Sequence, residues 1–169
     1  MAKKALIVVD LQNYFIGEGT LHLPRMIRER IGNGKYDEVV FTKFVNREGS
    51  RFWVSGWEHC MESPETDIHP DLAALAADSP VFEKYGFSAF RAEGLPDYLR
   101  RKGICEVHIC GTDTDACVLA SAYDAFELGF DVRVLEDLCA SRNGAEFHDM
   151  GLRIIRRNLG FGQAGQSNK

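Results

Sequence analysis

The sequence predicts an α/β fold in three layers, with a doubly wound parallel sheet between two layers of helices. Short apolar runs alternate along the chain with segments of helical periodicity, and this alternation is typical of parallel α/β proteins. The first run, residues 5–9, contains no polar residue, as expected for a strand that helices cover on both faces. Glycines close several of the helical segments, which is a common stop signal: Gly32, Gly103 and Gly129.

The expected elements follow one another in a regular order. Each short segment of four or five residues that is wholly or partly apolar is assigned to a strand, and each longer amphipathic segment that follows is assigned to a helix. Right-handed crossovers between parallel strands then place the helices on the sheet. The strands are expected at residues 5–9, 39–42, 81–84, 107–110 and 132–135, and the helices at 24–31, 71–77, 95–102, 114–128 and 143–158.

Residues 44–70 depart from this alternation because they show no clear period. The segment contains both tryptophans of the chain, Trp53 and Trp57, together with glycines and a proline. A long irregular segment after a strand is unusual in a compact domain and often shapes a binding site. Residues 1–160 are expected to form a single domain. The Gly-, Gln- and Ser-rich residues 161–169 are expected to form a flexible tail.

Composition and charge exclude several classes of protein. The chain has 169 residues, 45% of them hydrophobic and 27% charged, as in a soluble globular domain. Its net charge is −5 and it has no long basic stretch, so a nucleic-acid partner is not expected. The apolar run near the N-terminus is too short to cross a membrane or to form a signal peptide, so no membrane partner is expected.

The cysteines indicate a reducing compartment. There are five of them, an odd number, and no two form a Cys-x-x-Cys pair. This pattern argues against a disulfide framework and favours a cytoplasmic protein.

The most informative segment is 104–129, in which an apolar strand stops at Gly111 and a helical pattern begins after a short polar turn. Cys117 falls within the first turn of that helix. Unpaired backbone N–H groups and the helix dipole favour an anion there, so the thiol is expected to ionise readily and act as a nucleophile. A small buried thiol under a helix is the alternative, and this segment alone does not decide between the two.

Two further polar residues are expected at the same edge of the sheet. Asp10 follows the first strand and Lys84 ends the third, and ligands of open α/β sheets bind beyond the carboxyl ends of the strands. A carboxylate beside a thiol can accept its proton, and an ammonium group favours the thiolate. The turn at residues 111–114 can supply backbone N–H groups for the oxyanion of an acyl-transfer reaction.

The same residues lie in stretches that resemble a known family. The chain is similar to the isochorismatase-like cysteine hydrolases, the superfamily of nicotinamidases and N-carbamoylsarcosine amidohydrolases. The resemblance covers nearly the whole chain, and it implies a six-stranded sheet in the order 3-2-1-4-5-6. The residues near Phe161 give little support for the sixth strand, so whether it forms is left open. The matching stretches are 9–15, Lys84 with 88–90, 111–118, 124–129, Asp137 and 140–141.

The resemblance also implies roles for individual residues. Cys117 is then the nucleophile, Asp10 the general base and Lys84 the third member of a catalytic triad. The N–H groups of Asp113 and Cys117 form the oxyanion hole, and a cis peptide bond joins Thr112 to Asp113. The oligomeric state common in the family further implies a homodimer or homotetramer.

One departure from the family concerns metal binding. Nicotinamidases carry an Asp-x-His metal motif just after the second strand, where this chain has Phe44 and Asn46. His59 and His69 remain, but two histidines ten residues apart are a weak metal signal. No catalytic metal and no cofactor are therefore expected, and nicotinamide is disfavoured as a substrate. Isochorismatases proper cleave a vinyl ether and lack the cysteine, so the presence of Cys117 disfavours that reaction too.

Substrate contacts are expected from residues within or between the matching stretches and from the irregular segment. Aromatic residues at such places also belong to the core in many proteins. Arg47 or Arg51 is a further candidate, as a partner for a substrate carboxylate. The expected substrate-binding residues are Gln12, Phe15, Trp57 and Phe90.

Together these features predict a metal-independent hydrolase of a small amide or ureido C–N bond, acting through a thioester. A receiver-like phosphoacceptor domain is disfavoured, because it needs an acidic pair at the first strand and an Asp closing the third. Two alternatives stay open. One is an isochorismatase-type hydrolase that uses Asp10 without covalent catalysis, and the other is a non-catalytic member that acts as a binding or regulatory subunit.

Overall fold

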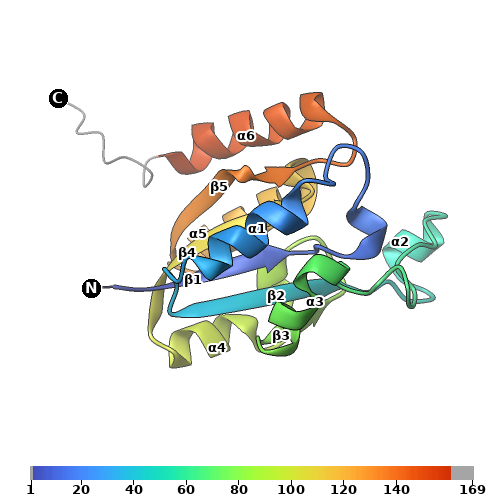
Figure 1. Cartoon of the computed structure of the whole chain (residues 1–169). Coiled ribbons are helices and arrows are strands. Elements are labelled where there is room, and N and C mark those ends of the chain that lie inside the picture. Colours follow the sequence, from blue (N-terminus) through green and yellow to red (C-terminus); the bar gives the residue numbers. More distant parts are fainter. Residues whose placement is uncertain (1, 161–169) are drawn as a thin grey trace.

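A computed structural model describes residues 2–160, which form one parallel sheet flanked by helices (Figure 1). The five strands pair in the order β3-β2-β1-β4-β5, and every pair is parallel. This order confirms the predicted fold class. The position suggested for a sixth strand, near Phe161, lies outside the described residues. The strands are β1 (Lys3–Val9), β2 (Glu38–Phe44), β3 (Val81–Lys84), β4 (Ile104–Thr112) and β5 (Asp131–Ala140).

Helices cover both faces of the sheet, as the alternation in the sequence predicts. The helices α1 and α3 pack against each other on one face, and α5 packs against α6 on the other, where α4 contacts β4 (Figure 1). The α-helices are α1 (Leu23–Gly32), α2 (Arg51–Val54), α3 (Pro70–Ala77), α4 (Leu95–Arg101), α5 (Leu119–Glu127) and α6 (Ala145–Leu159). Three short helices are named η1 (Asn13–Phe15), η2 (Ala89–Arg91) and η3 (Thr114–Val118).

The central strand β1 explains why the site lies where it does. Its residues 5–9 are completely buried between the two helical layers, in agreement with their uniformly apolar sequence. Beside it, Gly111 on β4 has φ +120°, and a Cβ atom there would lie 2.1 Å from the Val9 carbonyl oxygen. Only glycine permits this close approach of the two strand ends. Asp10, directly after β1, is therefore brought next to the turn that follows β4.

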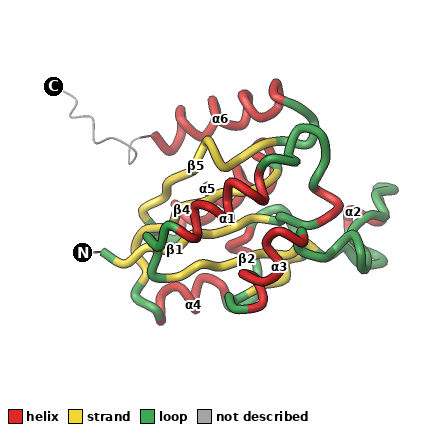
Figure 2. The backbone as a smooth tube through the Cα atoms, viewed as in Figure 1, coloured by secondary structure: helices red, strands yellow, loops and turns green. Residues whose placement is uncertain are grey.

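Two differences from the expected elements matter for the site. Strand β5 extends to Ala140, beyond the expected end at residue 135, because it pairs with β4 as far as Ala140. Its polar residues Glu136 and Asp137 form ion pairs with Arg156 and Arg30. The irregular segment contains the one-turn helix α2. In Figure 2 this part of the chain consists mainly of loops and protrudes from the body of the fold.

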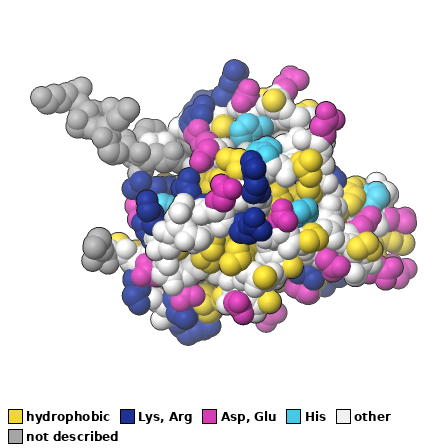
Figure 3. Space-filling view, in the orientation of Figure 1, with side chains coloured by type: hydrophobic (Ala, Val, Ile, Leu, Met, Phe, Trp, Pro, Cys, Tyr) yellow, Lys and Arg dark blue, Asp and Glu magenta, His cyan; other side chains and the backbone are white. Residues whose placement is uncertain are grey.

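Basic and acidic side chains are mixed over the face of the molecule shown in Figure 3. Within residues 2–160, no helix has the length and apolar character needed to cross a membrane.

Candidate active site

The structure brings Asp10, Lys84 and Cys117 together at the carboxyl edge of the sheet. The Lys84 Nζ atom lies 2.7 Å from the Asp10 Oδ2 atom and 3.4 Å from the Cys117 Sγ atom. The Asp10 and Lys84 side chains are 0% exposed, and Cys117 is 8% exposed. The three residues come from three separate segments of the chain, and the rule that strand ends converge predicts this meeting.

Asp10 is held in a fixed orientation by β2. The Thr42 hydroxyl donates a hydrogen bond of 2.8 Å to Asp10 Oδ1, and it accepts one of 3.3 Å from the Asp10 backbone N–H. Asp10 also has φ +52°, a left-handed conformation that residues other than glycine rarely adopt. Such conformations are often found at functional sites, where the surrounding structure enforces them.

Lys84 remains a cation although it is buried. Its Nζ atom donates to the carbonyl oxygens of Gly86 and Phe87, each at 2.8 Å, in addition to its contacts with Asp10 and Cys117. Burial on its own lowers the pKa of Lys84, but the Asp10 charge and the hydrogen bonds of the ammonium group outweigh burial and raise that pKa. The site therefore holds a fixed positive charge beside the thiol.

The expectation of an easily ionised Cys117 is wrong for the free protein. Burial raises the pKa of the Cys117 thiol well above its usual range, and the nearby Asp10 carboxylate raises it further. Lys84 lowers that pKa, but by less than burial and Asp10 raise it. The thiol consequently carries its proton at neutral pH, and a base must remove this proton when the sulfur reacts. The Asp10 carboxylate lies within hydrogen-bonding reach of this thiol.

Cys117 lies in a short π-helix rather than in a regular α-helical turn. Within η3 the N–H of Val118 donates to the carbonyl oxygen of Asp113, five residues earlier. Wide turns of this kind occur frequently at functional sites. The Cys117 carbonyl accepts a 2.6 Å hydrogen bond from the Ser121 hydroxyl, which fixes the start of α5. The peptide bond between Thr112 and Asp113, just before η3, is cis.

The end of β5 holds the turn that carries Cys117. The backbone N–H of Arg142 donates to Asp113 Oδ1 at 2.7 Å, and the Ser141 hydroxyl donates to Asp115 Oδ1 at 2.5 Å. Burial raises the pKa of Asp113, while hydrogen bonds from Thr112 and Arg142 oppose this shift. The turn expected to supply the oxyanion hole is thus fixed by side-chain contacts at both of its acidic residues.

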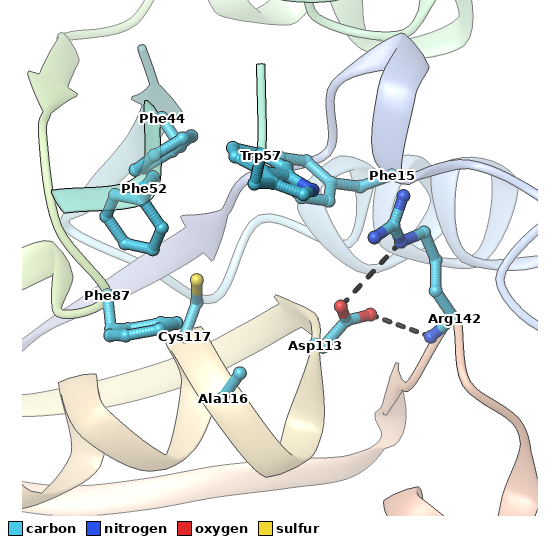
Figure 4. Close-up of a pocket in the computed structure, with 9 residues that line it drawn as sticks. All are labelled: Phe15, Phe44, Phe52, Trp57, Phe87, Asp113, Ala116, Cys117 and Arg142. Carbon is cyan, nitrogen blue, oxygen red and sulfur yellow. Dashed lines mark hydrogen bonds and ion pairs between the residues drawn. The ribbon is translucent and has the colours of Figure 1, made fainter. Parts of the chain in front are cut away.

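A cavity of about 210 Å³ opens next to the Cys117 sulfur. Five aromatic side chains form most of its wall, and among residues 2–160 the charged residues in the wall are Asp113 and Arg142. In Figure 4, Phe44, Phe52 and Phe87 lie on one side of the sulfur, and Asp113 and Arg142 lie on the other. The residues that line the cavity are Phe15, Phe44, Phe52, Trp57, Phe87, Asp113, Ala116, Cys117 and Arg142.

Two of the four expected substrate-binding residues lie in this wall. Phe15 and Trp57 line the cavity, whereas Phe90 and Gln12 do not. Phe90 belongs to the core, where its ring packs against Phe130 at a centroid distance of 5.6 Å. Gln12 is completely buried, and its amide group bonds the backbone N–H and carbonyl of Phe44. The expectation that these two residues bind substrate is therefore corrected. Phe90 packs in the core, and Gln12 joins the backbone at Phe44 to the backbone at Thr66.

Neither candidate arginine of the irregular segment belongs to the cavity wall. The Arg47 guanidinium lies over the Tyr85 ring, 4.7 Å from its centroid, and Arg51 is exposed on α2. Arg142 does line the cavity, although it was not among the residues expected there from the sequence. Arg142 lies two residues beyond the end of β5, so the strand-end rule would have indicated it had the predicted strand been long enough. No comparable feature of the sequence indicated that Phe52 and Phe87 would line the cavity.

The residues at the positions of the nicotinamidase metal motif do not fit a metal ion. The Phe44 ring packs against Phe52 and Trp57, at centroid distances of 5.1 and 5.7 Å. The Asn46 side chain is bonded to the backbone of Trp57 and Arg47. Within residues 2–160, no three side chains of His, Cys, Asp or Glu are grouped so that they could hold a metal ion.

The two histidines of the irregular region have other contacts. His59 pairs with Glu65 at 3.1 Å and stacks on the Tyr14 ring. His69 accepts a hydrogen bond from the Asp71 N–H at the start of α3. Both therefore contribute to local structure in the segment around the pocket.

Comparison with known proteins identifies the family. The sequence profile of the isochorismatase domain matches residues 4–164. This chain belongs to the isochorismatase family. A nicotinamidase/pyrazinamidase of Mycobacterium tuberculosis is 36% identical over 161 residues, which cover 81% of this chain and 86% of that protein. A nicotinamidase of Escherichia coli is 29% identical, with 85% of each chain covered.

Solved structures of the isochorismatase family show the same architecture. An isochorismatase-like hydrolase from Alkaliphilus metalliredigens superposes with a TM-score of 0.84 at 26% identity, covering 92% of each chain. The N-carbamoylsarcosine amidase of Thermoplasma acidophilum superposes with a TM-score of 0.78 at 26% identity, covering 94% of this chain and 93% of that one. These relatives confirm the expected enzyme class, an amidohydrolase acting on C–N bonds other than peptide bonds.

Proposed function

We propose that this protein hydrolyses the C–N bond of a small amide or ureido compound through a thioester on Cys117, without a catalytic metal. The observation that carries the proposal is the position of Lys84, whose ammonium group contacts both the Asp10 carboxylate and the Cys117 sulfur. A carboxylate and an ammonium group beside a thiol that opens onto a cavity support nucleophilic catalysis by that thiol. The relatives include a nicotinamidase and an N-carbamoylsarcosine amidase, and these activities support an amide or ureido substrate.

In the first half of the reaction the sulfur attacks the carbonyl carbon. Asp10 takes the thiol proton as the carbon–sulfur bond forms, and Lys84 stabilises the charge that develops on the sulfur. Asp10 then delivers this proton to the leaving nitrogen. The C–N bond breaks, ammonia or an amine departs, and the acyl group remains on Cys117.

In the second half a water molecule resolves the thioester. Asp10, again ionised, accepts a proton from the water as the oxygen attacks the acyl carbon, and the thiol recovers its proton as it leaves. The products are the carboxylic acid and the free enzyme. From a ureido substrate the acid formed is a carbamic acid, which loses CO₂. Each turnover consumes one water molecule.

The tetrahedral intermediates need donors for their oxyanion, and the turn before Cys117 supports that role. We propose the backbone N–H groups of Asp113 and Cys117 as these donors. Hydrogen bonds from Thr112, Ser141 and Arg142 fix the acidic residues of this turn. A rigid turn keeps such donors in place without reorganisation during the reaction, which is the source of their effect.

The aromatic wall supports the metal-independent form of the reaction. Phe44 fills the position of the metal-binding aspartate with an apolar ring, and the described residues that line the cavity include no histidine. The substrate is then held by contacts with side chains, and the carbonyl is polarised by backbone donors. For the protein as a whole, we propose a cytoplasmic homodimer or homotetramer whose partners are small-molecule substrates. Neither a nucleic acid nor a membrane is proposed as a partner.

Ammonia release from a panel of small primary amides and ureas tests the proposal. We expect turnover of at least one member and no loss of activity after treatment with a chelator. Mass spectrometry of the acid-quenched enzyme should show an acyl adduct on the peptide that contains Cys117. Turnover that requires an added metal, or an enzyme that releases product without an adduct in a rapid quench, contradicts the proposed mechanism.

A further inference from the structure

A groove on the surface of α5 adjoins the Cys117 cavity at Phe87. The groove has a volume of about 350 Å³. Phe87 and Ala116 line both the cavity and the groove, so the two spaces share a wall. Phe87 is 53% exposed and forms the boundary between them. The residues that line the groove are Phe87, Asp115, Ala116, Leu119, Ala120 and Tyr123.

Most of the groove is apolar, and small side chains leave room in it. Ala116 and Ala120 lie about one helical turn apart, and neither side chain extends beyond its Cβ atom. The larger side chains of Leu119 and Tyr123, which are also one turn apart, lie beside them. A chain of methylene groups that lies over the two alanines would therefore contact apolar surface on both sides.

The polar groups of the groove already have partners in the protein. The Tyr123 hydroxyl accepts a hydrogen bond from the Asn158 side chain. The Asp115 carboxylate accepts one from the Ser141 hydroxyl, at 2.5 Å. The groove therefore offers a ligand apolar surface, and a charged or strongly polar ligand group would gain little there.

The boundary at Phe87 is fixed by contacts on both sides. Its backbone carbonyl accepts a hydrogen bond of 2.8 Å from Lys84 Nζ, and its ring meets the Phe52 ring at a centroid distance of 5.2 Å. Two residues later, the Ala89 N–H donates to the Ser121 hydroxyl oxygen on α5, at 2.8 Å. These contacts hold the segment of Phe87 against α5. In Figure 4, Phe87 lies close to the Cys117 sulfur.

The size of the cavity indicates that a substrate can extend beyond it. A buried apolar cavity of about 150 Å³ can hold one benzene molecule, so the 210 Å³ beside Cys117 holds roughly eight non-hydrogen atoms. Hexanamide is a molecule of that size. Sites for small molecules usually have volumes of about 300–1,000 Å³, and the cavity reaches that range only when the groove is included.

We infer that the groove on α5 is a second part of the substrate site, and that the substrate is a neutral amide with an unbranched apolar acyl chain. The carbonyl group lies beside the Cys117 sulfur, and the chain passes Phe87 and lies on Ala116 and Ala120. The continuity of the groove with the cavity identifies the substrate chain as its occupant, and the burial of methylene groups favours binding. This inference rests on the proposed function and adds its substrate class.

A series of primary amides tests how far the site extends. Butanamide and hexanamide fit within the cavity, whereas octanamide must reach the groove. Each methylene group that is half to fully buried should increase kcat/KM by about two- to fourfold. We therefore expect octanamide to exceed hexanamide by about four- to sixteenfold. Equal or lower kcat/KM for octanamide overturns the inference, because the site then ends with the cavity.

Two variants on α5 assign the gain to the groove. Ala120→Glu places a charge on the groove floor and should remove most of the gain from hexanamide to octanamide, chiefly through a higher KM for octanamide. Phe126→Glu is the matched control, because it places the same charge on an exposed position of α5 that lines neither space, and it should keep the gain. An equal loss on butanamide and octanamide in Ala120→Glu overturns the inference, since it indicates a structural role.

Sedimentation of the same variants tests whether a second copy of the chain occupies the groove instead. We expect Ala120→Glu to have the oligomeric state of the unmodified protein. If Ala120→Glu changes the oligomeric state and still prefers octanamide to hexanamide, the groove is an interface between copies and the inference is wrong.

Binding measurements keep this inference separate from the proposed function. Calorimetric titration of Cys117→Ser with hexanamide and octanamide measures affinity without turnover. We expect octanamide to bind about four- to sixteenfold more tightly, and the added substitution Ala120→Glu to remove the difference. Turnover that depends on Cys117 without a preference for octanamide would leave the function standing and overturn the substrate class. Tighter binding of octanamide without any turnover by the unmodified enzyme would do the reverse.

Discussion

The Lys84 ammonium group and the Asp10 carboxylate form an ion pair of 2.7 Å in which both side chains are fully buried. Removing two charges from water is costly, and the mutual attraction of the pair offsets this cost only when the remaining polar atoms are also bonded. Thr42, Gly86 and Phe87 provide those bonds. The pair therefore links stability to the site, because the ammonium group that contacts the Cys117 thiol also compensates the buried charge of Asp10.

Replacing Lys84 by methionine should cost both activity and stability. Methionine keeps much of the side-chain volume but leaves Asp10 as a buried charge without its partner, which typically destabilises a protein by about 3–5 kcal/mol. Urea unfolding measures this loss. The double variant Asp10→Asn/Lys84→Met removes both charges and should be more stable than Lys84→Met. If the double variant is no more stable than Lys84→Met, the loss comes from packing rather than from an unpaired carboxylate.

The pKa of Cys117 leads to a prediction about alkylation. Because burial and Asp10 raise this pKa, the thiolate is scarce at neutral pH, and the rate of carboxamidomethylation by iodoacetamide should keep rising as the pH increases above 9. The rate must be followed on the Cys117 peptide by mass spectrometry, since the exposed Cys105 also reacts. A rate that is already at its plateau at pH 7 would show that the thiol is ionised in the free protein.

Asp10→Asn should separate thiol reactivity from catalysis. The Asp10 charge raises the thiol pKa, so its removal lowers that pKa and increases the thiolate fraction at any pH below it. Alkylation of Cys117 at pH 8 should therefore become faster while turnover is lost, because a carboxamide cannot accept the proton. Asp97→Asn, an exposed carboxylate on α4, is the control and should change neither rate. Slower alkylation in Asp10→Asn would contradict the electrostatic role assigned to Asp10.

Cys117→Ser distinguishes covalent catalysis from the isochorismatase-type alternative. A hydroxyl is much harder to deprotonate than a thiol, so turnover should fall by roughly 10⁴-fold or more, as when a nucleophile is removed from other hydrolases. Substrate affinity should stay close to that of the unmodified enzyme, because the cavity wall is unchanged. Near-full turnover in this variant would rule out the thioester, and Asp10 acting through water would then be the better mechanism.

The sequence predicts those parts of the site that depend on the ends of strands. All three residues of the site are expected at one edge of the sheet because each follows or ends a strand. Asp10 follows a fully apolar strand, Lys84 ends another strand, and Cys117 follows a strand and a glycine turn. These positions depend on topology, which the alternation of strands and helices determines. Their meeting at hydrogen-bonding distance follows from that topology together with the close approach at Gly111.

Properties that depend on how deeply a side chain is buried, and on packing between residues far apart in the sequence, could not be predicted from strand ends. The sign of the Cys117 shift depends on how completely the sulfur is buried, and a helix-terminus argument does not contain that information. Gln12 lies in a stretch that matches the family, but its amide bonds the backbone of residues more than thirty positions away. Phe52 and Phe87 meet at a centroid distance of 5.2 Å from two irregular segments whose paths only the tertiary structure determines.

Gly151 in α6 provides the last test, because this helix packs directly on the turn that carries Cys117. A Cβ atom at Gly151 would lie 2.9 Å from both the N and the Cα atoms of Asp115, and these backbone atoms cannot move away as a flexible side chain would. Alanine normally stabilises a helix interior by up to about 1 kcal/mol relative to glycine. Here the clash should outweigh that gain and destabilise the protein by roughly 1–3 kcal/mol.

The same substitution should reduce kcat, because displacement of Asp115 moves the adjacent turn at residues 111–114, whose N–H groups we propose as oxyanion donors. Gly32→Ala is the matched control: Gly32 ends α1, and a Cβ atom there meets nothing within 4 Å. Thermal unfolding and steady-state kinetics of the two variants should therefore diverge, with Gly32→Ala at least as stable and as active as the unmodified enzyme. If Gly151→Ala were as stable and as active as Gly32→Ala, the close packing of α6 on Asp115 would not be what holds the catalytic turn.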